Sequence, residues 1–298
     1  MMVTQKGVIS SLMTVKEKFT YRFLNMLARH FSRKSLSKRI RLANRLGAFA
    51  HNRIPIRKQE AFNNIKRAFS EKSDLWISNT LKSTYRTVCV NFTELLALPQ
   101  SMQSFKFNIE NQHVLDNALK EGKGVILITG HFGLWELWGA WLGHNGYPLW
   151  GIIQRQGNRG ADRFFIEKRE AYGLQQIYRK SSLDNIYKLF EENKMVILAS
   201  DQDAKRKGVF VKFFGHPAST PKGSAIFHMR TGAPMIFSVS NVELDGSISI
   251  SFSKVEVNGD ASIEAITQSY TTLLEAKVRE YPDHFFWFHQ KWKTQLPA

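Results

Sequence analysis

From residue 105 to the end, the chain alternates short apolar segments with longer amphipathic ones, and this alternation constrains its fold more than any other feature. The short segments have the length of buried strands, whereas the longer ones repeat apolar residues at helical spacing. The expected strands are 105–109, 125–129, 148–153, 195–199, 235–242 and 247–257. The expected helices are 111–121, 133–144, 161–172, 183–193, 221–231 and 261–280. This order predicts an α/β fold in which helices flank a mostly parallel central sheet.

Residues 1–100 have a different pattern, which predicts an N-terminal helical region before the α/β domain of residues 101–298. Residues 20–50 place apolar side chains every three or four positions among arginines and lysines, as one or two amphipathic helices with a cationic face do. A longer helix is expected from Ser73, a suitable N-cap residue, to the residue before Pro99. We expect the two regions to form one continuous globular unit.

The net charge of +17 and the isoelectric point near 9.9 indicate a partner with negative charge, such as anionic lipid, nucleic acid or an acidic protein. The cations are concentrated in residues 1–60, where Glu17 and Glu60 are the only acids. Basic amphipathic helices with Phe and Leu opposite their charges can lie in an anionic membrane interface. A plain solvated face is the alternative. No nucleic-acid-binding motif is recognisable, so we expect a membrane surface and not nucleic acid.

No window of 18 residues is apolar and uncharged enough to span a bilayer, because residues 134–153 contain Glu136, His144 and Pro148. Charged or polar residues interrupt each apolar run near the N-terminus, so no secretory signal is expected. The single cysteine, Cys89, excludes an intrachain disulfide and a cysteine-based metal site, and it makes a poor nucleophile inside an expected core stripe. We therefore expect a protein that is soluble or lies on a membrane surface.

The stretch GVILITGHFGLWE, residues 124–136, ends an apolar strand at a histidine, His131. In open parallel sheets the ligand crevice lies beyond the carboxyl ends of the strands, where His131 is expected. Glu136 falls inside the following helix, so the two side chains meet only if His131 lies in the turn before it. Gly130 and Gly133 permit such a turn. An imidazole beside a carboxylate suits the removal of a proton from a hydroxyl, although a structural histidine and a surface acid are the alternative.

Two blocks of sequence resemble a known family. HFGLWE, residues 131–136, is similar to the H-x4-[D/E] signature of glycerolipid-type acyltransferases and to the H-F-G-N-W-E of the bacterial lipid A biosynthesis (lauroyl/myristoyl) acyltransferase family. DQDAKRKGVFVKFFGHPASTPKGSAIFHMRTGAPMI, residues 201–236, resembles that family's D-Q…G-V-F-V-x-F-F-G-x-P-A-x-T-x-x-G…R-T-G-A-P block. EAFNNIKRAFS and YPDHFFWFHQKWK also match the family pattern, so the likeness extends from about residue 40 to the end.

The resemblance implies an O-acyltransferase that moves a fatty acyl chain from an acyl-carrier-protein thioester to a hydroxyl of a lipid A precursor. It makes His131 the general base and Glu136 the acid that orients it, with no covalent acyl-enzyme, cofactor or metal. It places the enzyme peripherally at the cytoplasmic face of a bacterial inner membrane. Leu134 replaces the family's usual Asn, and Gln290 and Lys291 replace two arginines, so the mode of membrane attachment and the acceptor stay open, with another glycolipid or phospholipid as the alternative acceptor. Acyl-CoA stays open as an alternative donor.

An acidic carrier protein and a lipid that carries phosphates would both bind cations. Residues 154–170 are rich in arginine and lysine, and Arg169 stands shortly before Gly173, as an Arg of the family pattern stands before a Gly. Under the resemblance, Asp201 and Gln202 border the active site and contact His131 or the acceptor. The expected substrate-binding residues are Arg155, Arg163, Arg169, Asp201, Gln202 and Lys222. A solvated helix face is the alternative for the other cations.

The segment STPKGSAIFHMRTGAP predicts a helix with Thr220 as its N-cap and Gly232 just after its end. Lys222 could bind a phosphate at the start of this helix, or the motif could be purely structural. A fatty chain also needs an apolar slot, and some of four clustered tryptophans could line it. They are Trp135, Trp138, Trp141 and Trp150.

Two other classes of protein remain as alternatives. Asp201 and Asp203 form a D-x-D at a strand end, which also occurs as the metal site of nucleotide-sugar glycosyltransferases. A non-enzymatic protein with a basic binding surface is the second alternative. Activity that survives chelators and disappears in His131→Ala would separate the acyltransferase from the glycosyltransferase. Salt-sensitive binding alone would not distinguish the non-enzymatic protein, since counterion release accompanies any phosphate contact.

Overall fold

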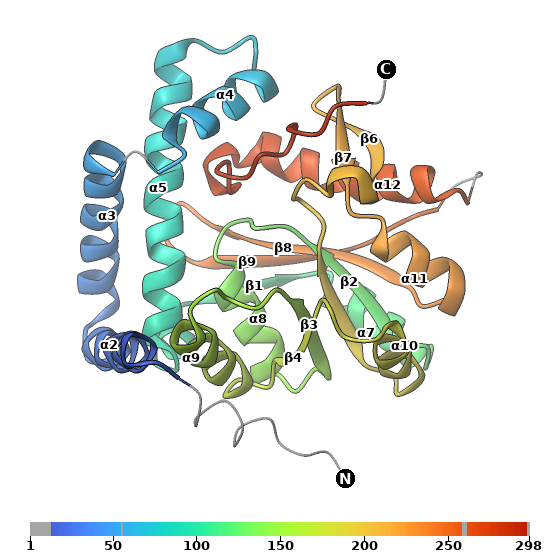
Figure 1. Cartoon of the computed structure of the whole chain (residues 1–298), viewed down its shortest axis with the longest axis horizontal. Coiled ribbons are helices and arrows are strands. Elements are labelled where there is room, and N and C mark those ends of the chain that lie inside the picture. The colour runs from blue at the N-terminus through green and yellow to red at the C-terminus, as the bar shows by residue number, and fades with distance from the viewer. Residues whose placement is uncertain (1–12, 55, 258–260, 297–298) are drawn as a thin grey trace.

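The structure is a computed structural model that describes residues 13–54, 56–257 and 261–296 (Figure 1). Residues 1–12, which include part of the segment searched for a secretory signal, lie outside the described residues. The centre is a seven-stranded sheet of order β1-β9-β8-β2-β5-β3-β4, in which every neighbouring pair is parallel except β8 and β9. Its strands are β1 Phe107–Glu110, β2 Val125–Thr129, β3 Leu149–Ile153, β4 Gln175–Tyr178, β5 Met195–Ala199, β8 Met235–Val242 and β9 Ile248–Lys254. The prediction of a mostly parallel sheet is confirmed.

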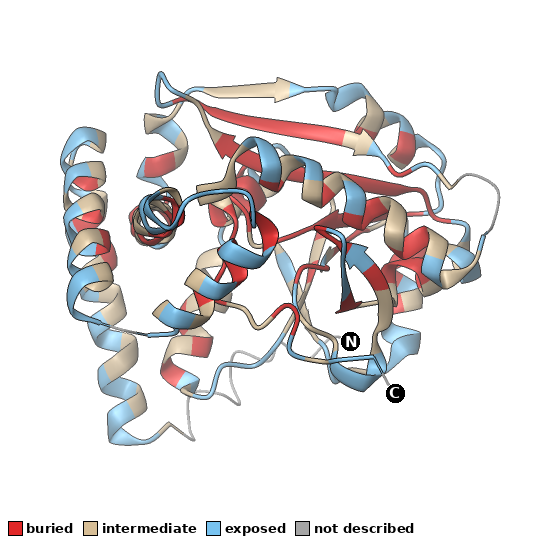
Figure 2. Cartoon of the chain, turned by 90° about the horizontal axis from the view of Figure 1, so that it is seen from above, coloured by how far each residue is buried: buried red, intermediate tan, exposed pale blue. Residues whose placement is uncertain are grey.

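The central strand β2 explains why the sequence shows continuous apolar runs and not alternation. Val125 and Leu127 belong to one hydrophobic cluster, whereas Ile126 and Ile128 belong to another. Successive side chains of a strand point to opposite faces, so β2 is buried between two layers of helices. Figure 2 shows the same arrangement, with buried strands between helices whose outer faces are exposed.

The helices expected after residue 105 are all present, with ends that differ by a few residues. They are α7 Gln112–Lys120, α8 Trp135–His144, α9 Arg159–Glu170, α10 Leu183–Glu191, α11 Gly223–Thr231 and α12 Ile263–Glu280. Gly232 ends α11 in the left-handed region, with φ +66°, as predicted. The predicted N-cap at Thr220 is wrong, because Thr220 pairs within a strand and Lys222 precedes the helix instead.

Several elements were not predicted. A separate antiparallel hairpin consists of β6 Val209–Phe213 and β7 His216–Thr220, joined by Phe214 and Gly215, both with positive φ. The edge strand β4 also escaped prediction, because its sequence QQIY has only one aliphatic residue. Two further helices, α4 Lys58–Ala68 and α6 Gln100–Ser104, were not predicted either. The 3-10 turns η1 Lys205–Lys207 and η2 Pro282–His284 complete the order of elements.

The N-terminal region is helical, as predicted. It comprises α2 Val15–Ser32, α3 Leu36–Arg53 and α5 Asp74–Ala97. Ser73 caps α5 by accepting a hydrogen bond from the Trp76 amide. Helix α5 contacts α3 and α8, and α2 contacts α9, so the N-terminal helices pack directly on the α/β region. Among the residues described, none forms a helix with the length and apolar character needed to cross a membrane.

A fully buried ion pair fixes α3 to α5. Arg39 Nε lies 3.0 Å from both carboxylate oxygens of Glu94, and the Ser101 hydroxyl donates to the same carboxylate at 2.6 Å. A buried charge that loses its partner is strongly destabilising. We expect Glu94→Ala to lower the free energy of unfolding by about 3–5 kcal/mol in urea titrations followed by circular dichroism.

The exposed pair of Lys66 and Asp74 provides the control for Glu94→Ala. Lys66→Ala should change the free energy of unfolding by less than about 1 kcal/mol, since exposed pairs contribute little. Equal losses in the two variants would contradict a special role for the buried pair.

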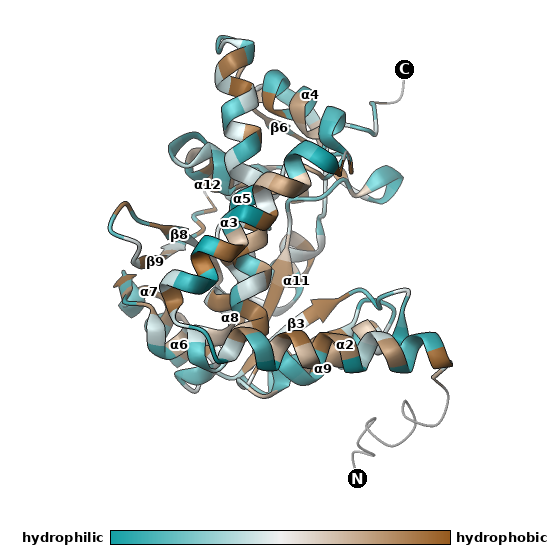
Figure 3. Cartoon of the chain, turned by 90° about the vertical axis from the view of Figure 1, so that its left-hand side faces the viewer, coloured by the Kyte–Doolittle hydropathy of each residue, from teal (hydrophilic) through white to brown (hydrophobic). Residues whose placement is uncertain are grey.

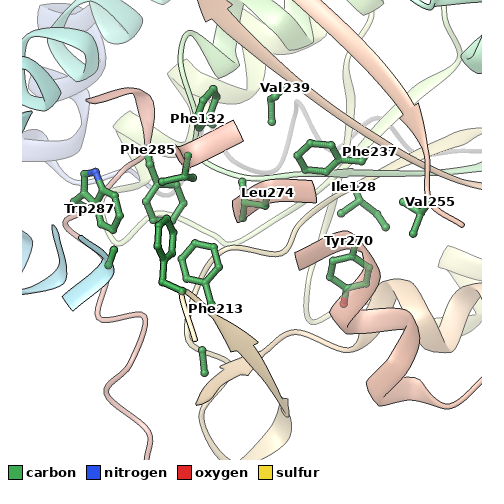
Figure 4. Packing of buried hydrophobic residues seen from close by; sticks show 14 of the residues in the cluster. Ile128, Phe132, Phe213, Phe237, Val239, Val255, Tyr270, Leu274, Phe285 and Trp287 are labelled. Atoms are coloured by element: carbon green, nitrogen blue, oxygen red, sulfur yellow. The ribbon is translucent and has the colours of Figure 1, made fainter. Parts of the chain in front are cut away.

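The C-terminal segment is part of the core and passes close to the end of β2. Phe285 and Trp287 pack in the larger cluster together with Phe213 of the hairpin, Leu274 of α12 and Ile128 of β2 (Figure 4). This packing carries the polar residues that follow Phe288 to the carboxyl ends of the central strands.

Candidate active site

His131 lies in the turn between β2 and α8, as predicted. The Phe286 amide donates to the His131 carbonyl at 3.0 Å, and the Gly133 amide donates to the His284 carbonyl at 2.9 Å, so the C-terminal segment fixes this turn. Gly133 has φ +59°, and a Cβ there would lie 1.8 Å from the Ser240 carbonyl oxygen. The turn therefore requires glycine at this position.

The carboxylate that contacts His131 is Asp201. His131 Nδ1 lies 3.0 Å from each carboxylate oxygen of Asp201. The two residues come together because β2 and β5 are neighbours, with Thr129 opposite Ala199 at their ends. Asp201 is fully buried, whereas 28% of the His131 side chain is exposed. The contact engages Nδ1 and leaves Nε2 as the ring atom available to a substrate.

The electrostatics of this pair favour a basic imidazole. Burial by itself lowers the pKa of His131, but the Asp201 carboxylate raises it to a net value above the ordinary one. Burial raises the pKa of Asp201, yet the adjacent imidazole lowers it to a net value well below the ordinary one. Asp201 is therefore ionised when His131 accepts a proton.

The prediction that Glu136 contacts His131 directly is wrong, because Glu136 pairs with Arg169 instead. Arg169 Nε lies 3.0 Å from Glu136 Oε2, and Arg169 Nη2 lies 2.5 Å from Oε1, so these two residues form a bidentate pair. The first turn of α8 directs Glu136 toward α9, which carries Arg169, and the Glu136 amide donates to the Asn91 side chain. The charge of Glu136 still raises the pKa of His131 from a distance.

A second histidine, His289, adjoins His131. The ring centroids lie 5.0 Å apart, and Gln202 Nε2 lies 3.0 Å from His289 Nε2. Burial lowers the pKa of His289 to about 4, so its ring is neutral near pH 7 and can accept the amide proton of Gln202. His289 was not predicted as a site residue, and the only signal for it in the sequence is its place in the aromatic run YPDHFFWFHQKWK.

Aromatic side chains form the surroundings of the pair. Trp135 lies edge-on to His131 with ring centroids 5.5 Å apart, and Phe286 lies 6.0 Å from the same ring. Of the four tryptophans considered for an acyl slot, Trp135 is the one in contact with His131. Trp138 is buried and donates to the Ser238 hydroxyl. Trp141 is likewise in the core, and Trp150 packs at its edge.

The predicted substrate-binding residues separate into two groups. Arg169, Asp201 and Gln202 lie next to Glu136, His131 and His289, respectively. The others lie elsewhere. Arg163 pairs with Glu167 and stacks over Tyr21, Arg155 stacks over Tyr178 at 4.6 Å, and Lys222 precedes α11.

The buried lysine Lys291 was noted in the sequence only as a departure from the family pattern. Its Nζ donates to the Thr220 hydroxyl at 3.0 Å and lies above the ring of Phe213. Burial lowers the pKa of Lys291 to about 8. Its position fixes the hairpin to the C-terminal segment.

The positions of the Asp201 and Asp203 carboxylates do not support a D-x-D metal site. Asp201 contacts His131, whereas Asp203 accepts from the Thr294 hydroxyl at 2.9 Å. The described residues that could together hold a metal ion are His131, Asp201 and His289, whose ligand atoms lie within 4.8 Å of one another. Asp203 is not part of this group.

An imidazole that contacts a buried carboxylate at two strand ends of an α/β sheet is suited to general-base chemistry. A family profile described as bacterial lipid A biosynthesis acyltransferase matches residues 10–294. The chain belongs to this family.

The curated relatives that the chain matches are named as acyltransferases. It is 26% identical over 184 residues to a phosphatidylinositol mannoside acyltransferase of Mycolicibacterium smegmatis, covering 60% of each chain. The corresponding enzyme of Mycobacterium tuberculosis is 26% identical over 187 residues, covering 61% of this chain and 58% of that one. A lipid A biosynthesis palmitoleoyltransferase of Escherichia coli is 23% identical over 271 residues, covering 85% and 84%. The chain thus spans about 60% of the length of the mycobacterial relatives.

Proposed function

We propose that the protein transfers a fatty acyl chain from an acyl-carrier-protein thioester to a hydroxyl of a lipid A precursor. The observation that carries the proposal is the His131–Asp201 pair, with Nδ1 held 3.0 Å from a buried carboxylate and part of the ring exposed. Family membership and the names of the relatives support an acyltransferase with a glycolipid acceptor.

In the proposed reaction, His131 Nε2 removes the proton of the acceptor hydroxyl while its oxygen attacks the thioester carbonyl carbon. The tetrahedral intermediate collapses, the C–S bond breaks, and the leaving sulfur takes the proton from the imidazolium. Asp201 holds the reactive tautomer and stabilises the imidazolium. No step needs a nucleophilic side chain, and burial raises the pKa of Cys89, which keeps this thiol unreactive.

Glu136 and Arg169 have a positioning role in this proposal. Their bidentate pair fixes the first turn of α8 to α9, and that turn directly follows His131. Because the carboxylate of Glu136 raises the pKa of His131, it also favours the proton-bearing state of the ring. Arg169 therefore acts through Glu136 in our proposal.

The test of the function is acyl transfer by purified protein, with mass spectrometry of the lipid product. Lipid A precursors and phosphatidylinositol mannosides should each be offered with acyl carrier protein and with CoA thioesters as donors. Product formation with the lipid A precursor and the carrier protein supports the full proposal. Transfer only to phosphatidylinositol mannosides would replace the acceptor in the proposal, and transfer only from CoA thioesters would replace the donor. Absence of transfer with every donor and acceptor would refute the proposal.

The surface of α2 supports a peripheral position of the protein at an anionic membrane. We propose that this membrane surface is the cytoplasmic face of the inner membrane. Val15, Phe19, Phe23 and Met26 recur at helical spacing and are exposed, and Lys16, Lys18 and Arg22 lie between them. Figure 3 shows apolar and hydrophilic residues alternating along α2 and α3. Exposed Phe and Met with adjacent cations match the composition of helices that lie in a lipid interface.

We expect Phe19→Ser combined with Met26→Ser to weaken binding to anionic vesicles by about tenfold or more, because two apolar side chains no longer enter the lipid. Cosedimentation with vesicles that contain an anionic phospholipid measures the effect. The control combines Leu183→Ser with Met229→Ser, two comparably exposed residues of α10 and α11. Equal binding by the two double variants would contradict the assignment of α2.

A further inference from the structure

A cationic pocket opens beside the candidate active site, and the reaction described above does not use it. Its volume is about 650 Å³. It lies where the chain leaves β4 and β5, next to the 3-10 turn η1 Lys205–Lys207 and the end of the C-terminal segment. We define the basic pocket by its lining residues, which are Arg179, Asp203, Ala204, Lys205, Arg206, Lys207, Lys293 and Thr294.

The charges of the basic pocket are not balanced within the protein. Five of its residues are cations, and Asp203 is the one acid that lines it. One oxygen of Asp203 accepts from Thr294. Among the described residues, no acidic side chain forms an ion pair with any of the five cations. Like charges held around one hollow repel each other, so the pocket fits an anion with more than one negative charge.

The turn that presents three of these cations has a fixed backbone. Lys205 has φ +56°, in the left-handed region that a side chain disfavours. The Ser219 hydroxyl donates to the Lys205 carbonyl at 2.6 Å, and the Ala204 amide donates to the Ser219 carbonyl at 3.1 Å, so β7 holds the turn in place. Strained backbone that its surroundings fix is concentrated at functional sites.

Two chain segments connect the basic pocket to Asp201 of the catalytic pair and to His289, which adjoins His131. Asp203 follows Asp201 by two residues, and Lys293 follows His289 by four. The hairpin β6–β7 lies on the opposite side of the molecule from α2 and α3, and so does the C-terminal segment (Figure 1). If α2 and α3 face the lipid, the pocket faces the water, where the thioester donor arrives.

We propose that the basic pocket binds the phosphate groups of the thioester donor. This inference rests on the proposed function, since it concerns the donor of that reaction. A phosphate-bearing pantetheine arm is common to acyl carrier proteins and to CoA. Phosphate oxygens accept charge-assisted hydrogen bonds from guanidinium and ammonium groups. The arm would extend from the pocket toward His131 and place the thioester carbonyl there.

The test compares two triple variants of the full chain that lose equal charge. The pocket variant carries Lys205→Ala, Arg206→Ala and Lys207→Ala. The control variant carries Lys120→Ala, Lys188→Ala and Lys254→Ala, all exposed and outside the pocket. We expect the pocket variant to raise KM for the phosphate-bearing donor by about 10- to 100-fold. KM for the lipid acceptor and for an acyl-pantetheine donor without phosphate should not change.

Separate donors identify the source of the phosphate. A rise in KM for acyl carrier protein thioester alone assigns the pocket to the carrier protein, and a rise for acyl-CoA alone assigns it to CoA. A rise in KM for the lipid acceptor instead, or equal changes in the control variant, would overturn the inference.

A binding experiment keeps this inference distinct from the proposed function. Titration calorimetry with CoA and with pantetheine needs no turnover. Binding of CoA that the pocket variant loses and the control variant keeps supports the phosphate site even if no acyl transfer is found. CoA binding that both variants keep equally, together with an unchanged KM for carrier-protein donor, would refute the site while leaving the acyltransferase proposal intact.

Discussion

His131→Ala is expected to lower kcat for acyl transfer by about 10²–10⁴-fold, because the reaction loses its positioned general base. The effect should appear in kcat more than in KM, since the imidazole acts on the proton that moves in the transition state. Initial rates at saturating donor and acceptor measure it. Part of the ring is exposed, so the fold should persist, and circular dichroism checks this.

The matched control is His113→Ala, which removes an exposed histidine of α7 that is remote in sequence from both strand ends. It should leave kcat unchanged. A folded His131→Ala variant with the kcat of the wild-type protein would remove the imidazole from the mechanism and with it the proposed reaction.

Asp201→Asn is expected to reduce kcat by about 10²–10⁴-fold although it preserves the shape of the side chain. An amide can donate to Nδ1, which would place the ring proton on Nε2 and leave no base facing the hydroxyl. The loss of charge also removes the stabilisation of the imidazolium. Steady-state kinetics measure the effect. The control variant is Asp245→Asn, which changes an exposed residue in a turn.

The pH dependence gives a second readout for Asp201. The base must be neutral to act, so kcat/KM of the wild-type protein should fall as pH decreases through the raised pKa of His131. Without the Asp201 carboxylate this pKa decreases, and the acidic limb of the residual activity should move to lower pH. An acidic limb at the same pH in both proteins would show that Asp201 does not control the protonation of His131.

The local patterns of the sequence predicted most of the secondary structure. Helical spacing and strand-length apolar runs identified the helices α7 to α12 and six strands of the central sheet, including β2 and β5. Such patterns report which face of each element is buried, and this depends on nearby residues only. They failed for β4 and β7, whose sequences QQIY and HPAST contain too few apolar residues to show a period. The apolar strand β6, VFVKF, was also missed.

What the sequence by itself determined was that His131 lies at a strand end, in the position of a ligand crevice. The sequence and its family resemblance offered both Glu136 and Asp201 as acids near His131, and only the tertiary structure decided that Asp201 is the one in contact. The order of the sheet places β5 beside β2 and brings Asp201 to Nδ1 across 70 residues, while α9 supplies Arg169 to Glu136. The approach of His289 and the five cations of the basic pocket depend on the same packing. Periodicity carries information about burial, whereas the choice of partner depends on which elements become neighbours in space.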